Sequence, residues 1–288
     1  MNIINQPVLS LILLSLFLSS CEKTIDSDGD DTGLNDGNLT ITVSQLEQTP
    51  FSDIARKGVT DACTHLNYAV YDLAGSRVKL INQQLGDKNF GTVSLQLTEN
   101  DYRVVVVAHS SNGNPTMTDP AKISFTNTMG FTDTFLYSQI LKVGEKPQTQ
   151  SISLSRIVAL CRFTINDSYP QEVIRMRFKY KGGSAAFNAY TGLGCTNSTQ
   201  TVTFDVASGK NQFDLYTFLT DKQGVIELTV EALDATDNVV RERDFRFPMI
   251  QNKITWLSGN FFGEGDAEFS KVDIDIITDW DGEIRIPF

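Results

Sequence analysis

The strongest constraint on the fold is a repeated pattern of short segments in which apolar and polar residues alternate. Residues 38–46 (NLTITVSQL) and 90–97 (FGTVSLQL) alternate in this way, which is typical of strands with one buried face. Residues 102–109 (YRVVVVAH) form a β-branched run that fits a strand buried on both faces. Similar segments follow at intervals of roughly 8 to 12 residues, and none shows a sustained helical period. The pattern predicts an all-β fold built from β-sandwiches.

The length of the chain favours two sandwiches in tandem. Its 288 residues suit two domains of roughly 100 to 150 residues each, after a signal and a tether are set aside. Residues 151–165 form a long β stretch that we expect to leave the first sandwich and continue directly into the second. We therefore predict sandwiches at 39–152 and 153–288, joined by a stiff junction. The glycine-rich residues 181–194 are predicted to form a long loop.

The N-terminus holds a short apolar run, Val8–Leu18, which stops at Leu-Ser-Ser-Cys21. About 20 apolar residues are needed to cross a membrane, so this run fits the apolar part of a secretory signal better. Leu-Ser-Ser-Cys resembles the lipobox of bacterial lipoproteins, in which the cysteine is acylated and becomes the first mature residue. The resemblance predicts a signal peptide at 1–20 and a lipid on Cys21. The segment Met1–Gln6 lacks Lys and Arg, and an ordinary signal peptide cut near a cysteine is the alternative.

Residues 21–38 are predicted to be an acidic tether. Aspartates are scattered there among Gly, Ser, Thr and Asn, with almost nothing to bury. A calcium loop would need Gly at its sixth position and Glu at its twelfth, but those positions hold Asp31 and Gly37. Acidic residues just after the cysteine also resemble the signal that sends Bacteroidetes lipoproteins to the outer face of the outer membrane.

Charge and cysteine content exclude some functions. A net charge of −11 argues against a nucleic-acid partner, because phosphate backbones are bound through Lys and Arg. Beyond Cys21 the chain has Cys63, Cys161 and Cys195. Cys161 lies in an apolar strand and is expected to be a buried free thiol. A Cys63–Cys195 disulfide is compatible with an oxidising compartment, but the sequence alone does not establish it.

The residues that could carry catalysis are few and poorly placed. The two histidines, His65 and His109, lie on a strand and at a strand end, outside any metal-binding spacing. Asp273 and Asp275 are two residues apart and share one face of a predicted strand, as on a half-exposed strand. The sequence has no nucleophile elbow and no phosphate loop. We therefore expect no enzyme activity, no cofactor and no metal site.

Several phrases together resemble one family, the Bacteroidales fimbrial anchor subunits, which are relatives of the fimbrillin lipoproteins. The lipobox at Cys21 is one of them. Residues 154–165 (LSRIVALCRFTI) look like the mid-chain strand of the family, and residues 252–262 (NKITWLSGNFF) look like its Asn-x-x-Thr-x-Leu-x-Gly-x-x-Phe phrase. The resemblance implies two tandem transthyretin-like β-sandwich domains on a lipid-anchored protein of the outer membrane, exposed at the cell surface. It also implies that fimbrial stalk subunits, the fimbrillins, are the partners.

In this family, stalk subunits are cut after an Arg in the N-terminal domain, and the groove left by the lost first strand accepts a C-terminal strand from a neighbour. Arg56 lies in a predicted loop after the first strand and is the candidate cleavage site. The C-terminus GEIRIPF places Ile284, Ile286 and Phe288 on one face of an extended strand, as strand addition requires. The alternative is that this segment is the last strand of its own domain.

Three functions follow from these observations. The first is a non-enzymatic, lipid-anchored subunit that attaches a fimbrium to the outer membrane through acyl chains on Cys21. The second is a surface lipoprotein that binds a glycan or a host ligand, for which Trp256 and Trp280 are the only tryptophans. The third is a stalk or tip subunit whose mature chain would begin at Lys57.

Overall fold

The computed structural model describes residues 37–47, 49–50, 63–126, 130–206, 209–263, 273–275 and 283–288 of the chain. Every regular element in these residues is a β-strand, so the predicted all-β fold is confirmed. No helix in the described residues is long and apolar enough to span a membrane.

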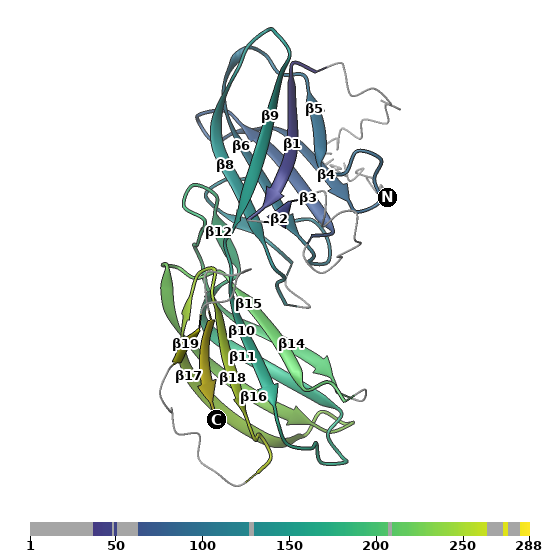
Figure 1. The fold of residues 1–288 in the computed structure, drawn as a ribbon, viewed down its shortest axis with the longest axis vertical. Helices are drawn as coiled ribbons and strands as arrows, with labels where there is room; N and C mark the ends of the chain where they lie inside the picture. Colours follow the sequence, from purple (N-terminus) through teal and green to yellow (C-terminus); the bar gives the residue numbers. More distant parts are fainter. Residues whose placement is uncertain are drawn as a thin grey trace, which may run out of the picture. The chain divides into compact units, whose positions relative to one another are not determined.

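The N-terminal half forms an eight-stranded sheet in which the first strand lies beside the last (Figure 1). Its strands in spatial order are β2 (Thr49–Pro50), β1 (Leu39–Leu46), β9 (Gln148–Arg156), β8 (Phe135–Val143), β6 (Asn100–His109), β3 (His65–Tyr71) and β4 (Arg77–Gln84), with β5 (Thr92–Leu95) also paired to β1. β8 and β9 share only the pairs Phe135↔Arg156 and Leu136↔Ser155. The sheet can therefore fold over at that point, and strands β1, β3, β5 and β6 all contribute to one core.

Two sequence predictions are confirmed in this half. Ala74-Gly75-Ser76 between two strand-like runs predicts a hairpin, and residues 65–84 form it: β3 pairs with β4 and Gly75 in the turn has φ of 88°. β6 is the predicted doubly buried strand, because Val104 to Ala108 are all 0% exposed. Alternate residues of β6 belong to two different apolar clusters on the two faces of the sheet.

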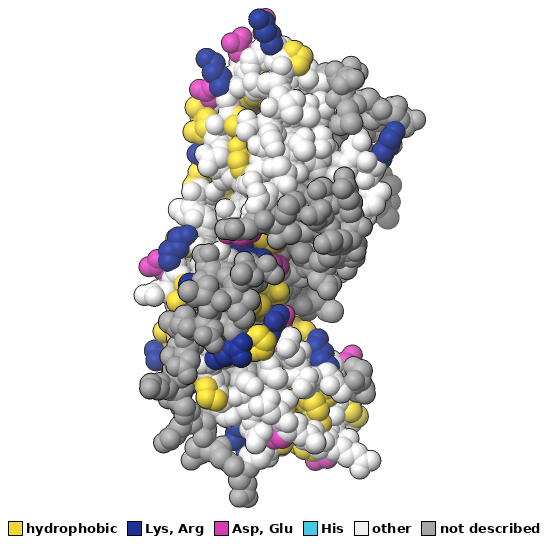
Figure 2. Space-filling model, viewed as in Figure 1, with side chains coloured by type: hydrophobic (Ala, Val, Ile, Leu, Met, Phe, Trp, Pro, Cys, Tyr) yellow, Lys and Arg dark blue, Asp and Glu magenta, His cyan; other side chains and the backbone are white. Residues whose placement is uncertain are grey.

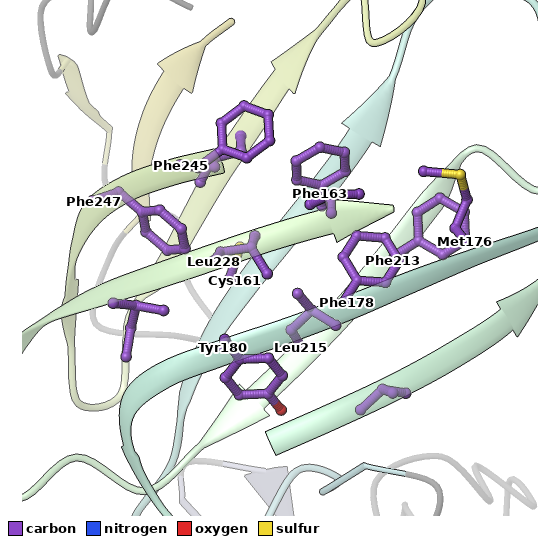
Figure 3. Packing of buried hydrophobic residues seen from close by; sticks show 14 of the residues in the cluster. Cys161, Phe163, Met176, Phe178, Tyr180, Phe213, Leu215, Leu228, Phe245 and Phe247 are labelled. Carbon is purple, nitrogen blue, oxygen red and sulfur yellow. The ribbon is translucent and has the colours of Figure 1, made fainter. Parts of the chain in front are cut away.

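The C-terminal half forms two sheets that enclose a second core. One sheet has the order β15 (Gln212–Thr217), β10 (Ala159–Ile165), β18 (Ile254–Gly259), β20 (Glu283–Pro287) and β19 (Asp273–Asp275). The other has the order β14 (Asn197–Asp205), β11 (Arg175–Ser184), β16 (Gln223–Leu233) and β17 (Val239–Ile250). Figure 3 shows the aromatic rings of this core, among them Phe163, Phe178 and Phe213, filling the space between the strands. Phe163 packs edge-to-face on Phe178 at 5.5 Å between ring centroids.

The stretch 151–165 is two strands and not one. β9 ends at Arg156 in the first sheet, and β10 begins at Ala159 in the second. The two residues between them, Ile157 and Val158, are buried in a third apolar cluster. The chain therefore changes sheets through a buried connection.

The prediction of a long loop at 181–194 is wrong. Residues in this range complete β11 and then form β12 (Ala186–Asn188) and β13 (Leu193–Gly194), and β12 pairs with β7 (Ile123–Ser124) from the first half. The glycines serve packing: Gly182 has φ of 94° beside an irregular register. A Cβ on Gly183 would lie 1.9 Å from Thr217 Oγ1, so only glycine allows this approach.

The third cluster packs both halves of the chain around β12. Phe187 on β12 is fully buried, and its ring centroid lies 5.0 Å from that of Phe218 and 6.5 Å from that of Phe125. Residues from β3, β6 and β8 line the same cluster. Apolar packing, rather than a continuous strand, therefore joins the residues on either side of Ile157.

We expect Phe187→Ala to lower the free energy of unfolding by about 3 to 5 kcal/mol, because it leaves a cavity in this cluster. Tyr190→Ala on the same hairpin is the control, since Tyr190 is 49% exposed, and it should cost about 1 kcal/mol or less. Urea unfolding followed by tryptophan fluorescence measures both variants. Equal effects would contradict a role for Phe187 in this packing.

Candidate functional site

The structure describes only some of the predicted site residues. Cys21, Arg56 and Trp280 lie outside the described residues. The C-terminal residues Ile284, Ile286 and Phe288 are described, although for Ile284 only the backbone is. The lipidation site and the cleavage site therefore stay predictions.

The C-terminal segment forms β20 within the chain's own second half, which is the position that the alternative interpretation gives it. β20 runs parallel to β18 and antiparallel to β19. Ile286 is 5% exposed in the second core. The Phe288 ring stacks on Phe163 at 4.7 Å between centroids and meets Phe245 edge-on at 4.9 Å. Donation of this strand to another subunit would require it to leave these contacts.

Gly259 at the end of β18 makes the seat of Phe288 very tight. A Cβ on Gly259 would lie 1.5 Å from the Phe288 carbonyl oxygen, which no side chain can tolerate. The Phe288 N–H donates to the Ser258 carbonyl at 2.9 Å. Phe288 is thus held by backbone contacts as well as by the packing of its ring.

β1 occupies the matching position in the first half. It runs parallel to β9 over Leu39–Leu46 and antiparallel to β5 over Leu39–Thr42, and Figure 1 shows it between these two strands. The four side chains that β1 contributes to the first core are at most 3% exposed; they are Leu39, Ile41, Val43 and Leu46. Backbone hydrogen bonds on both sides and apolar pockets on one face are the contacts by which a protein binds an extended strand.

Polar side chains hold both ends of β1. At the start, Asn38 Nδ2 donates to the carbonyls of Leu97 and Gly144, each at 2.8 Å, and its Oδ1 accepts from the Leu97 N–H at 2.9 Å. At the end, Glu47 accepts from the Arg156 N–H at 2.7 Å and from Asn252 Nδ2 at 3.1 Å. Glu47 and Asn252 have φ of 52° and 58°, so the backbone of both residues is in the left-handed region.

An ion pair lies beside the Glu47 contact. Arg156 binds Asp133 through Nε at 2.7 Å and through a terminal nitrogen at 2.9 Å. The side chains of this pair are only 8% and 11% exposed, and the guanidinium lies 4.8 Å from the centre of the Phe135 ring. Burial raises the pKa of the Asp133 carboxyl and the nearby Glu47 carboxylate adds to this rise, while the Arg156 hydrogen bonds oppose it.

The histidines form a structural network. The Ser111 N–H donates to His109 Nδ1 at 3.1 Å, so the ring proton must lie on Nε2, which donates to Asn67 Oδ1 at 2.8 Å. Asn67 Nδ2 donates in turn to Asn82 Oδ1, also at 2.8 Å. The His65 ring stacks on His109 with 5.0 Å between centroids. Burial lowers the pKa of His109 to about 3, and the charge of His65 contributes, so His109 is neutral near neutral pH.

The cysteines are all free thiols in the described residues. Cys161 is 2% exposed, which confirms the prediction that it is a buried apolar residue. Cys63 is buried and Cys195 is exposed, and neither forms a disulfide. Burial raises the pKa of the Cys63 thiol to about 12, which leaves it unreactive at neutral pH.

The described residues contain no group of three or more His, Cys, Asp or Glu side chains that could hold a metal ion. The Trp256 ring is half-buried, with the Arg162 guanidinium 5.1 Å and the Arg285 guanidinium 5.2 Å from its centre. Trp256 is therefore not a free platform for a sugar ring. On the face in Figure 2, the apolar side chains of the described residues lie in separate small patches among charged ones.

Sequence reasoning identified β1 and β20 as strands but missed the polar residues that hold β1. Asn38 directly precedes the Leu39–Leu46 segment, and an Asn at that position is a local signal for hydrogen bonds from its side chain to the backbone. The partners of Glu47 could not be predicted from the sequence, because Arg156 and Asn252 are 109 and 205 residues away in the chain.

Comparisons with known proteins give one family and several distant structural neighbours. Residues 35–287 match a family described as being of unknown function, DUF6562. No curated protein matches the chain.

Three of the similar solved structures are remote in sequence. A proposed adhesin from Bacteroides ovatus is 15% identical, with a TM-score of 0.48 over 72% of this chain and 81% of that one. A fimbrial assembly protein from Parabacteroides distasonis is 14% identical, with a TM-score of 0.40 over 77% of this chain and 89% of that one. The fimbrial anchor protein Mfa2 from Porphyromonas gingivalis is 11% identical, with a TM-score of 0.40 over 72% and 81%.

The histidine network predicts a loss of stability in acid. Folded His109 stays neutral down to a pKa of about 3, whereas an unfolded histidine binds a proton below about 6.5. The contribution of neutral His109 to the free energy of unfolding is therefore complete above pH 6.5. It falls by about 1.4 kcal/mol per pH unit as the pH drops toward 3.

The difference between the wild type and His109→Gln isolates this effect. Between pH 7 and pH 5, the unfolding free energy of the wild type should fall by about 2 kcal/mol more than that of the variant. Urea titrations at each pH measure it. Parallel pH profiles would show that His109 is protonated in the folded protein.

Proposed function

The chain belongs to the DUF6562 family, whose function is unknown, and from its strand geometry we propose that it is a non-enzymatic structural subunit of a fimbrium. Subunits join by exchanging β-strands, and a lipid on Cys21 holds this subunit at the outer membrane. The observation that carries the proposal is the seat of β1, which is an extended strand inserted between β5 and β9.

The position of β1 in the sequence makes it removable. A cut after Arg56 would separate β1 and β2 from the rest of the chain, since both strands end before residue 51. The first core would lose apolar side chains of β1 that are now almost fully buried. An open groove between β5 and β9 would remain, with unpaired backbone groups on both sides, and such a groove binds another strand strongly.

The C-terminal strand has the properties of a donor. Ile284, Ile286 and Phe288 alternate with Glu283, Arg285 and Pro287, as Leu39, Ile41 and Val43 alternate with polar residues in β1. Each of the two strands runs parallel to a neighbour in its sheet: β1 to β9, and β20 to β18. The partner strand β19 has only three residues, so β20 lies near the edge of its sheet, and its release has to break the contacts of Ile286 and Phe288 described above.

The role of this subunit depends on whether β1 is kept. If Arg56 is not cut, the acyl chains on Cys21 stay attached to the sandwiches, and the subunit is an anchor with a closed first groove. If Arg56 is cut, the chain begins at Lys57 and its groove is open, as in a stalk or tip subunit. The resemblance at residues 154–165 and 252–262 to fimbrial anchor subunits favours the anchor.

The mature N-terminus tests the anchor role. We expect mass spectrometry of the protein purified from the native membrane to show a first residue Cys21 that carries acyl chains. A chain that starts at Lys57 would identify a processed stalk or tip subunit instead. A chain recovered without lipid and without any surface appendage would refute the proposal.

The donor role of β20 is tested by removing it. Deletion of Glu283–Phe288 should leave a folded lipoprotein, checked by circular dichroism and thermal unfolding, that no longer enters the filament. Ile286→Ala should weaken assembly in the same direction, whereas Pro287→Ala, which changes an exposed residue, should assemble normally. Normal assembly by the folded deletion variant would exclude β20 as the donor.

A further inference from the structure

We propose that two copies of this chain associate side by side by pairing their β14 strands (Asn197–Asp205) antiparallel about a twofold axis. The four-stranded sheets of the two copies then join into one continuous sheet. This contact goes beyond the proposed function and is independent of it, because neither β1 nor β20 belongs to that sheet. We call the side of β14 that faces away from β11 the β14 edge.

Several other sheet edges in the described residues are protected against pairing with another chain. An unpaired strand presents a row of backbone N–H and C=O groups, and proteins block such rows with charges, prolines, bulges or very short strands. β2 has two residues, one of them proline, and β19 has three residues, two of them aspartates. β4 carries Arg77 and Lys79 beside an irregular register. The bridge between Phe131 and Tyr216 covers part of the edge at β15.

The two edges of the sheet that contains β14 differ in this respect. β17, at one edge, carries five charged side chains and Pro248 along its length. β14, at the other, has the nine residues NSTQTVTFD, without proline and with Asp205 at its end as the only charge. Within the described residues β14 pairs only with β11, and Figure 1 shows it at the margin of its sheet. A long edge strand without protective devices is a site where another strand pairs.

A cleft of about 490 Å³ beside the β14 edge gives room for the side chains of an added strand. Val202 and Phe204 from the inner face of β14 line it, together with Leu215 and Tyr216 of β15 and with residues 130–133. β15 is the edge strand of the facing sheet, so the cleft lies between two sheet edges. Phe204 is only half-buried there. A strand paired with β14 would place its inward side chains at this cleft and remove more of Phe204 from water.

A second β14 strand fits this edge. When the antiparallel pair is centred on Thr201, all nine residues of each strand are paired. On the exposed face Thr199 then lies opposite Thr203 of the second copy, and Thr201 lies opposite its own counterpart. Cross-strand threonine pairs of this kind stabilise antiparallel sheets. On the inner face Phe204 lies opposite Ser198 of the second copy, so that a large side chain meets a small one.

The charge of the chain also favours a contact through β14. The net charge is −11, so two copies repel each other less where the contact surface is almost uncharged. In the pair centred on Thr201, the two Asp205 carboxylates lie at opposite ends, about 27 Å apart along the strands. That distance is well beyond the screening length of about 8 Å at physiological salt. A twofold pair also uses both β14 edges, so association stops at two copies.

Sedimentation velocity of the full-length chain tests the proposal, in a mild detergent that keeps the apolar run Val8–Leu18 from associating. We expect a monomer–dimer equilibrium for the wild type. Thr201→Lys and Thr201→Glu should each raise the dissociation constant at least about tenfold, because each sets like charges directly opposite one another. An equal mixture of the two variants should dimerise again, since lysine then faces glutamate, and this recovery shows that both are folded. Thr149→Lys, at an exposed threonine of β9, is the control and should dimerise as the wild type does.

Disulfide trapping tests the register of the pair. In a background that carries Cys21→Ser and Cys195→Ser, Thr201→Cys should form a covalent dimer in air. Opposite residues of antiparallel strands have Cα atoms about 4.5 to 5.5 Å apart, which is within the range of a disulfide. Thr199→Cys should form a covalent dimer only when it is mixed with Thr203→Cys.

The outcomes separate this contact from strand exchange. A wild type that sediments as a monomer at every concentration, with no covalent dimer of Thr201→Cys, would overturn the β14 pairing and leave strand exchange standing. A dimer that neither Thr201→Lys nor Thr201→Glu weakens would place the contact elsewhere and overturn the proposal as well. Deletion of Glu283–Phe288, which removes the proposed donor strand, should leave the dimer intact. Loss of the dimer in that folded variant would contradict a contact through β14 alone.

Discussion

The parallel pairing of β1 with β9 is the interaction on which the N-terminal half depends. β1 contributes four buried side chains to the first core and pairs with strands on both sides. Without it, the sheet that contains β9 would have no continuous link to β5. β1 is the first strand of the described residues and lies inside the sheet, where the proposed exchange would replace it with a strand of the same pattern. The closure of the first core thus depends on a single strand.

The end of β1 connects this pairing to the second half of the chain. Glu47 follows β1 directly, and its carboxylate is bound by Arg156 at the end of β9 and by Asn252 in the turn between β17 and β18. Gln251 in the same turn donates to the carbonyls of Ile157 and Gly192. The turn therefore links the end of β1 to the connection between β9 and β10.

Local patterns in the sequence predicted the strands because alternation and β-branching reflect burial at each position. They identified the doubly buried β6, the β3–β4 hairpin and the buried Cys161. They failed at residues 181–194, where glycine was taken as a loop signal. Gly183 is there because Thr217 approaches its Cα, and that approach depends on a strand more than thirty residues away. The donors around Glu47 were missed for the same reason, since nothing near residue 47 specifies them.

The proposed donor role of β20 has to be reconciled with its place in its own half. In its own sheet it fills a groove beside β18, with Ile286 in the core and Phe288 against Phe163. That groove protects an alternating apolar strand, which would otherwise aggregate when exposed. Both strands are paired on two sides, but β1 pairs with β9 over Leu39–Leu46, whereas β20 pairs with β18 only over Glu283–Pro287. In the exchange that we propose, this longer pairing would favour the seat of β1 over the native position of β20.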